Sequence, residues 1–191
     1  MFKKIIFLCA LFIITGCVTQ SENQPSQPII GQHEPETVLQ QAEAWFGQSA
    51  MNTADVINRV INDQGPPDAY IMGEEVAASL GAGLRYGGGD IYLRDGSSQE
   101  IYWRGPSVGV DTGINASRVF ILIYGADRVT DLYTRLGGVE GSVYVVGGVS
   151  VTYHQGADVT VVPVRVGVGM RAGANIGYIQ FSEEAEANPF F

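Results

Sequence analysis

The chain contains few residues of several types, and each shortage excludes a class of function. Its two cysteines, Cys9 and Cys17, both lie near the amino terminus, so the rest of the chain can form neither a disulfide nor a cysteine-based metal site. Lysine is absent after Lys4, and histidine occurs only at His33 and His154. Because no group of His, Asp and Glu has metal-ligand spacing, the sequence predicts no metal and no cofactor.

Positive charge is also scarce. The net charge is −9, and loss of Lys3 and Lys4 with the amino-terminal segment would take it to −11. An acidic surface repels the phosphate backbone of nucleic acids. The sequence therefore predicts that the protein does not bind nucleic acid.

The apolar run over residues 5–14 is too short for the roughly 20 residues of a spanning helix, which predicts a signal peptide over 1–16. Ile14-Thr15-Gly16-Cys17 resembles the bacterial lipoprotein signal, in which cleavage precedes a diacylated cysteine. The resemblance implies a membrane anchor at Cys17, and Val18 in place of an aspartate points to the outer membrane. A plain secretory signal with an incidental Cys17 is the alternative.

The mature chain divides by composition. Residues 17–34 are rich in Gln, Ser, Asn and Pro, which predicts a flexible linker. Apolar residues at helical spacing predict two short helices in a helical preface over 35–66, one from Pro35 to the stop at Gly47 and one over 53–62. A β domain over 67–182 and an acidic C-terminal tail over 183–191 follow.

Glycine, valine, isoleucine and tyrosine are abundant in the β domain, which predicts a mainly β fold. Repeated glycines inside strands indicate sharp bending, so we expect a small Gly-rich antiparallel β-barrel of about eight strands. The strands are predicted at 70–80, 83–94, 99–103, 107–113, 118–124, 142–153, 159–168 and 170–181, with turns at Gly105-Pro106 and 115–117. One helix is predicted over 126–135, between strands five and six.

The segment 162–178 has two different faces. Residues of one parity are apolar, from Val162 to Tyr178, whereas the other parity alternates Arg165 and Arg171 with glycines. Strand residues of opposite parity point to opposite faces of a sheet, so one face of this part of the barrel carries cations.

Gly105-Pro106-Ser107-Val108-Gly109 matches the G-x-S-x-G motif of serine hydrolases. That motif lies between a strand and a helix, with a histidine and an acid nearby. Here a strand is predicted to follow, and His154, beside a predicted turn, is expected on the surface. The sequence therefore predicts that the protein is not an enzyme, and a hydrolase using Ser107 is the third alternative for its function.

Arginines and aromatic residues of the β domain form the candidate ligand site. Guanidinium groups bind anions through paired hydrogen bonds and stack on aromatic rings. These side chains could line a groove for an anionic or amphipathic ligand, or they could lie on a solvated barrel exterior. The set comprises Tyr86, Tyr102, Trp103, Arg104, Arg118, Arg165 and Arg171.

Many short motifs, in order from about Trp45 to the carboxyl end, are similar to the bacterial envelope integrity protein A (EipA) family, long described as a domain of unknown function. They include Gly83-Leu84-Arg85-Tyr86-Gly87, Tyr102-Trp103-Arg104-Gly105-Pro106-Ser107, Tyr133-Thr134-Arg135, Val162-Pro163-Val164-Arg165, Gly173-Ala174-Asn175-Ile176-Gly177-Tyr178 and Asn188-Pro189-Phe190. The chain departs from the family pattern at Arg104, where a glutamine is usual, and in its lipoprotein signal.

The resemblance implies a small eight-stranded periplasmic β-barrel that maintains the cell envelope, with no catalytic residues carried over. We therefore expect a non-enzymatic periplasmic lipoprotein that contacts envelope lipid, lipopolysaccharide or an envelope protein. A looser similarity, from Gly83 to about Val151, is to SYLF lipid-binding domains. It makes a lipid carrier or sensor, with a ligand beside Trp103, the second alternative.

Overall fold

The structure is a computed structural model of the 191-residue chain, and it describes residues 32–47, 52–138, 144–146, 148–167, 176–186 and 188. Within these ranges, the side chains of 79–82, 107–113, 115, 144–146 and 176 are not described. The predicted signal peptide, Cys17 with most of the predicted linker, and Arg171 lie outside the described residues.

In the described part of the chain, two helices precede the sheet. Helix α1 spans Pro35–Phe46 and helix α2 spans Thr53–Gln64. Pro35 is the first residue of α1. Proline has no backbone N–H, and it fits this position because the N–H groups of the first turn have no partner within the helix. Gly47 and Gly65 end the helices with φ angles of 67° and 89°, a conformation that glycine adopts without strain. The two predicted amino-terminal helices are confirmed.

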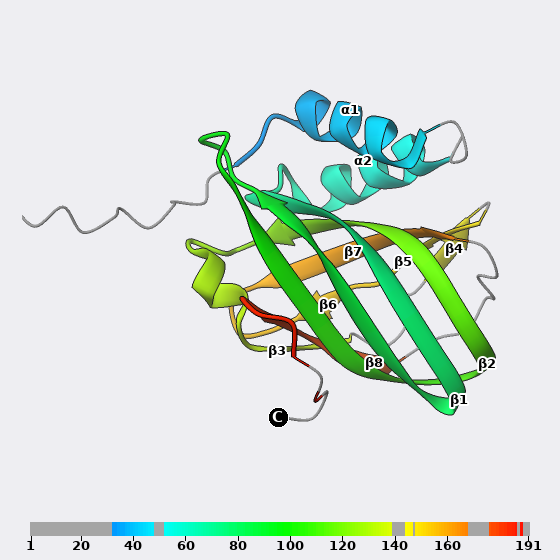
Figure 1. Cartoon of the computed structure of the whole chain (residues 1–191). Helices are drawn as coiled ribbons and strands as arrows, with labels where there is room; N and C mark the ends of the chain where they lie inside the picture. The colour runs from blue at the N-terminus through cyan, green and yellow to red at the C-terminus, as the bar shows by residue number, and fades with distance from the viewer. Residues whose placement is uncertain are drawn as a thin grey trace, which may run out of the picture.

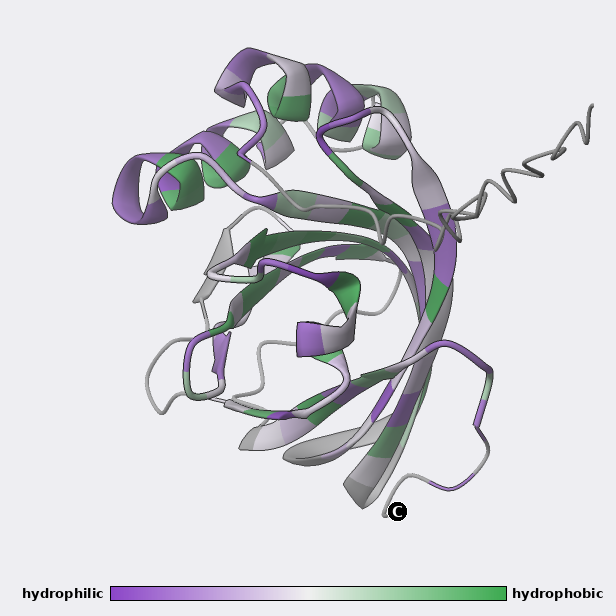
Figure 2. Ribbon diagram, turned by 90° about the vertical axis from the view of Figure 1, so that its left-hand side faces the viewer, coloured by the Kyte–Doolittle hydropathy of each residue, from purple (hydrophilic) through white to green (hydrophobic). Residues whose placement is uncertain are grey.

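In the residues that the structure describes, eight strands form one antiparallel sheet that closes into a barrel (Figures 1 and 2). Their order is β1-β2-β8-β3-β6-β7-β5-β4, and a further pairing of β2 with β7 closes the ring. The strands are β1 (Ala69–Tyr92), β2 (Ser98–Tyr124), β3 (Arg135–Gly138), β4 (Tyr144–Val146), β5 (Val149–Val151), β6 (His154–Gln155), β7 (Thr160–Gly167) and β8 (Ile176–Ser182).

Strand β1 bends so that its two arms lie side by side. The register with β2 shifts between Leu80 and Ala82, and the arm before the shift and the arm after it pair with opposite halves of β2. The arms meet at glycines: a Cβ on Gly73 would overlap the carbonyl oxygen of Gly88 and lie 2.7 Å from the Trp103 ring. Close backbone approach therefore requires glycine here, as the strand glycines predicted.

The sheet buries apolar side chains on both faces. Inside the barrel, Ile121 and Ile123 of β2 join a core with Ile71 and Trp103. On the outer face, side chains of the opposite parity pack against α1 and α2, which lie over one side of the barrel (Figure 2). This second core includes Val38, Ala42, Val56, Ile57, Val60, Phe120, Leu122, Val162 and Val164.

The predicted turns at Gly105-Pro106 and 115–117 do not occur, because β2 runs without a break from Ser98 to Tyr124. Pro106 is tolerated inside this strand since the pairing of β2 with β8 is interrupted between Arg104 and Ser107. Gly105 allows the carbonyl of Tyr178 to approach the backbone closely.

The predicted helix over 126–135 is also wrong. The segment forms only a four-residue 3-10 helix, Val129–Leu132, and β3 begins at Arg135. The Asp131 carboxylate accepts hydrogen bonds from the amides of Asp127 and Arg128, at 3.1 and 2.9 Å. Such local contacts favour a turn over a longer helix. Val129 and Leu132 still enter the interior core.

We predict that Gly73→Ala destabilises the barrel, because the new Cβ would meet backbone atoms that cannot move aside. Overpacking of this kind lowers the free energy of unfolding by about 1–3 kcal/mol. Gly137→Ala is the matched control, since its Cβ would have no neighbour nearer than 3.9 Å. Urea unfolding followed by tryptophan fluorescence measures both, and equal midpoints would contradict the prediction.

Candidate functional site

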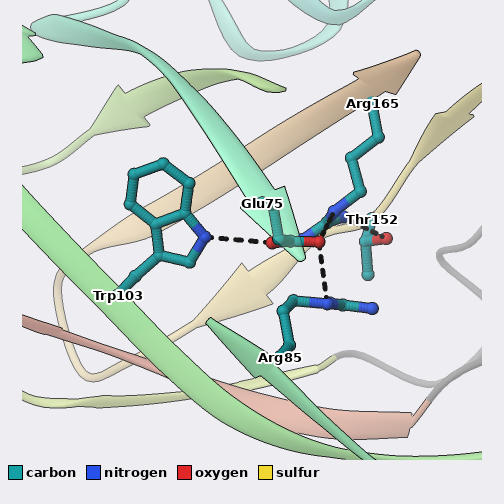
Figure 3. Close-up of polar contacts among 5 residues, drawn as sticks. All are labelled: Glu75, Arg85, Trp103, Thr152 and Arg165. Atoms are coloured by element: carbon teal, nitrogen blue, oxygen red, sulfur yellow. Dashed lines mark hydrogen bonds and ion pairs between the residues drawn. The ribbon is translucent and has the colours of Figure 1, made fainter. Parts of the chain in front are cut away.

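A buried carboxylate, Glu75, joins four segments of the barrel (Figure 3). The Nε atoms of Arg165 and Arg85 each lie 2.9 Å from its Oε1 atom. Trp103 Nε1 donates a hydrogen bond to Oε2 at 2.9 Å, and Arg165 Nη2 donates to the same atom at 3.3 Å. Arg165 Nη1 also donates to Thr152 Oγ1 at 3.2 Å. We call these five residues the interior cluster.

The interior cluster lies where the arms of β1 come together. Glu75 belongs to the first arm and Arg85 to the second, while Trp103 comes from β2 and Arg165 from β7. Glu75 has the same parity as Ile71, and Arg165 has the same parity as Val161, so both side chains point into the barrel. The closure of the strands therefore assembles the cluster from distant parts of the sequence.

Charge pairing keeps the interior cluster ionised. Burial would raise the pKa of Glu75, but Arg165, Arg85 and the hydrogen-bond donors outweigh burial and hold the pKa below its usual value. Burial and the nearby Arg165 lower the pKa of Arg85 to about 10, although Glu75 opposes this shift. At neutral pH the Glu75 carboxylate is therefore charged and the Arg85 guanidinium is protonated, and the ion pairs of Glu75 bind the strands together.

His154 lies inside the barrel and not on the surface as predicted. It is 2 % exposed, and its strand β6 pairs with β3 and β7. Burial, then the charges of Arg165 and Arg85, lower the pKa of His154 to about 3. The ring is neutral at neutral pH.

The context of a serine nucleophile is missing at Ser107. The strand β2 continues past this residue to Tyr124, so no helix follows the motif. The side chain of Ser107 is not among those described. The arrangement of the backbone therefore gives no support to the hydrolase alternative.

A pocket of about 340 Å³ lies on the outer face of the same barrel wall. Its wall is formed by Tyr86, Gly87, Gly88, Tyr102, Trp103 and Arg104. The two glycines leave room for aromatic rings on the two faces of the wall: a Cβ on Gly87 would overlap the Trp103 ring inside, and one on Gly88 would lie 3.0 Å from the Tyr102 ring outside. Glu74 and Val76 lie along one side. We call this space the outer pocket.

The C-terminal tail forms the opposite side of the outer pocket. Ser182, Ala185 and Glu186 line it, and the acidic segment after β8 lies outside the barrel wall (Figure 2). Arg104 Nη2 forms an ion pair with Glu186 Oε2 at 2.6 Å. The Arg104 side chain is only 3 % exposed, whereas that of Glu186 is 47 % exposed. A buried cation at the end of the pocket is thus paired with an exposed carboxylate of the tail.

The structure brings together four of the predicted ligand residues, Tyr86, Tyr102, Trp103 and Arg104, at the outer pocket. The other arginines are elsewhere. Arg165 belongs to the interior cluster and does not lie on the solvated exterior. Arg118 contacts α1, where its Nη1 donates to the Trp45 carbonyl at 3.0 Å and its guanidinium lies 5.6 Å from the Trp45 ring. Arg171 and Cys17 lie outside the described residues.

Glu75, Arg85 and Glu186 were not predicted from the sequence. Glu75 could have been found, because Glu74 and Glu75 are adjacent in one strand and point to opposite faces, so one of the two charges had to face the interior. Nothing local predicts which arginines pair with it.

Among the described residues, no three His, Asp or Glu side chains lie close enough together to hold a metal ion. In the same part of the chain, no helix has both the length and the hydropathy needed to cross a bilayer.

The fold and its polar groups define a small antiparallel β-barrel with external helices, whose interior charges serve as a bridge between strands. The sequence profile of the family Envelope integrity protein A matches residues 31–190. The chain therefore belongs to the envelope integrity protein A family, as the motifs predicted. The membership indicates association with the cell envelope.

One solved structure agrees with this assignment. The crystal structure of a β-barrel-like, uncharacterized protein from Brucella abortus is 35 % identical to this chain and has a TM-score of 0.71. The similarity covers 83 % of this chain and 99 % of that chain. No curated protein shows significant similarity.

We predict that Glu75→Gln strongly destabilises the protein. It would leave Arg85 and Arg165 buried together without their carboxylate. Breaking a buried ion pair by removing one partner lowers the free energy of unfolding by about 3–5 kcal/mol. Glu74→Gln, at the exposed neighbouring position, should change it by less than about 0.5 kcal/mol. Urea denaturation compares the two, and similar midpoints would show that the bridge contributes little.

His154 should make the protein less stable in acid. Its pKa is about 3 when folded and near 6.5 in the unfolded chain, so between these values the unfolded chain binds a proton that the folded chain does not. Stability should therefore fall as the pH drops below about 6.5, by up to about 1.4 kcal/mol per pH unit.

His154→Gln should flatten this dependence between pH 6.5 and 4.5, where Glu75 remains charged. His33→Gln is the comparison and should flatten the dependence less, because burial also lowers the pKa of His33 but its ring is only half-buried. The measurement is the slope of unfolding free energy against pH, and an unchanged slope in His154→Gln would refute this role.

Proposed function

We propose that this protein is a non-enzymatic periplasmic lipoprotein, held at the outer membrane by acyl chains on Cys17, that supports the integrity of the cell envelope. The observation that carries the proposal is the family match over residues 31–190, which spans both helices and the barrel. The Ile14-Thr15-Gly16-Cys17 signal supports the anchor, since two or more acyl chains give stable attachment.

Covalent geometry limits how far the barrel can lie from such an anchor. The chain between Cys17 and the start of α1 at Pro35 reaches at most about 60 Å when fully extended. The barrel would then work within this distance of the membrane surface. Its partners would be envelope lipid, lipopolysaccharide or an envelope protein.

The interior cluster supports a role without catalysis. Its one carboxylate is shared by two guanidinium groups and an indole N–H. A general acid or base needs a pKa near the working pH, whereas the pKa of Glu75 is held below its usual value and that of Arg85 is about 10.

A lipid carrier or sensor is the second candidate. The observation that favours it is the outer pocket, which lies beside Trp103 and has an aromatic wall and one buried arginine. Concave sites lined mainly by apolar groups, with a few placed polar groups, are typical of small-molecule binding.

A strain that lacks the gene tests the envelope role. We expect it to be more sensitive to deoxycholate and to EDTA than its parent, and we expect the wild-type gene to restore growth. Unchanged sensitivity to both agents would contradict the proposal.

We predict that Cys17→Ser releases the protein from the membrane fraction into the soluble periplasmic fraction, because the acyl chains can no longer be attached. Fractionation and immunoblotting measure this, with Ser107→Ala as a control that should stay with the membrane. A wild-type protein that is already soluble would remove the anchor from the proposal.

A further inference from the structure

The outer pocket is lined by both apolar and charged groups. Tyr86, Tyr102 and Val76, which is 51 % exposed, provide apolar surface. Arg104 is the partner of Tyr86 on the neighbouring strand and forms an ion pair with Glu186 of the tail. The distribution of these groups matches a molecule that is itself amphipathic.

Arg104 requires an anionic partner. A guanidinium group is expensive to bury without a counter-charge. In the ion pair that the structure shows for Arg104 at the outer pocket, the carboxylate is that of Glu186, from the tail beyond β8. Ser182 holds the tail near Arg104. Its Oγ atom accepts a hydrogen bond from Arg104 Nη1 at 3.4 Å and donates one to the Glu184 carbonyl at 2.8 Å.

We propose that the outer pocket binds a single-chain anionic amphiphile, with its chain against Tyr86 and Tyr102 and its carboxylate or phosphate on Arg104, in the place that the Glu186 carboxylate occupies here. Glu186 is then an internal competitor, and the tail moves aside when the ligand enters. The inference rests on the lipid-binding candidate above, and it adds the ligand class and the residue that selects it.

The size and charge of the site support this choice. A volume of about 340 Å³ is near the lower end for small-molecule sites, which suits one alkyl chain better than a whole two-chain lipid. The protein carries a net charge of −9, so long-range attraction of an anion is weak. Recognition must therefore come from direct contact with Arg104, where charge-assisted hydrogen bonds are strong.

Calorimetry on the purified full chain tests the proposal, with Cys17→Ser in every sample so that no detergent is needed. The probes are laurate, dodecyl phosphate and dodecyl maltoside, each below its critical micelle concentration. We expect at least one anionic probe to bind about tenfold or more tightly than the uncharged maltoside. Preference for laurate would indicate a fatty acid, and preference for dodecyl phosphate a phospholipid-derived ligand.

Three variants test whether Arg104 binds the ligand or only holds the tail through Glu186. Arg104→Gln should lower the affinity for the anionic probes by about tenfold or more and leave the affinity for the maltoside unchanged. Glu186→Gln changes a half-exposed position, so the protein should still fold, and the affinity for the anionic probes should rise several-fold. Arg94→Gln removes an exposed arginine elsewhere and should change neither.

Equal binding of all three probes, or no binding of any, would overturn the proposal. Unchanged or weaker anion binding in Glu186→Gln would overturn it as well, and would leave Glu186 as a fastening for the tail only. These results concern the purified protein. The envelope role is tested separately by the deletion strain, so either idea can fail while the other stands.

Discussion

The closure of this barrel depends on the ion pairs of Glu75. Its two oxygens contact side chains from the second arm of β1, from β2 and from β7, which are the segments that must meet for the ring to close. A buried ion pair often adds little net stability, because both charges lose their hydration. Its larger effect here is to select one register of the strands, since any other register would leave a buried charge without a partner.

The interior cluster and the outer pocket are two sides of one wall. Trp103 donates to Glu75 from inside, and its ring fills the space beside Gly87, its partner on the neighbouring strand. On the outer face, Gly88 is the partner of Tyr102 and lies in the wall of the outer pocket. Glycine at these two positions therefore leaves room for an aromatic ring on each face of the wall, the indole inside and Tyr102 outside.

Local sequence patterns predicted much of the fold, but they did not predict which face of each strand points into the barrel. Glycine-rich strands, helix stop signals and alternation predicted a barrel with two amino-terminal helices, and four residues of the outer pocket were among those predicted to bind a ligand. Alternation around Arg165 showed that the two faces of β7 differ, yet not which one faces inward. The helices cover the outer face, so Val162 and Val164 are buried outside the barrel while Arg165 points into it. The inward direction of Arg165 depends on its ion pair with Glu75, which is far away in the sequence, so no local pattern predicts it.

The same geometry explains why a ligand site would lie on the outside of this barrel. In the part of the chain that the structure describes, the interior at the level of Trp103 is occupied by an apolar core and by a charged cluster whose groups already bind one another. A ligand there would have to replace contacts that hold the strands together. Outside, Arg104 is paired with a carboxylate on a tail that contributes no strand to the barrel, so an exchange of partners leaves the ring intact.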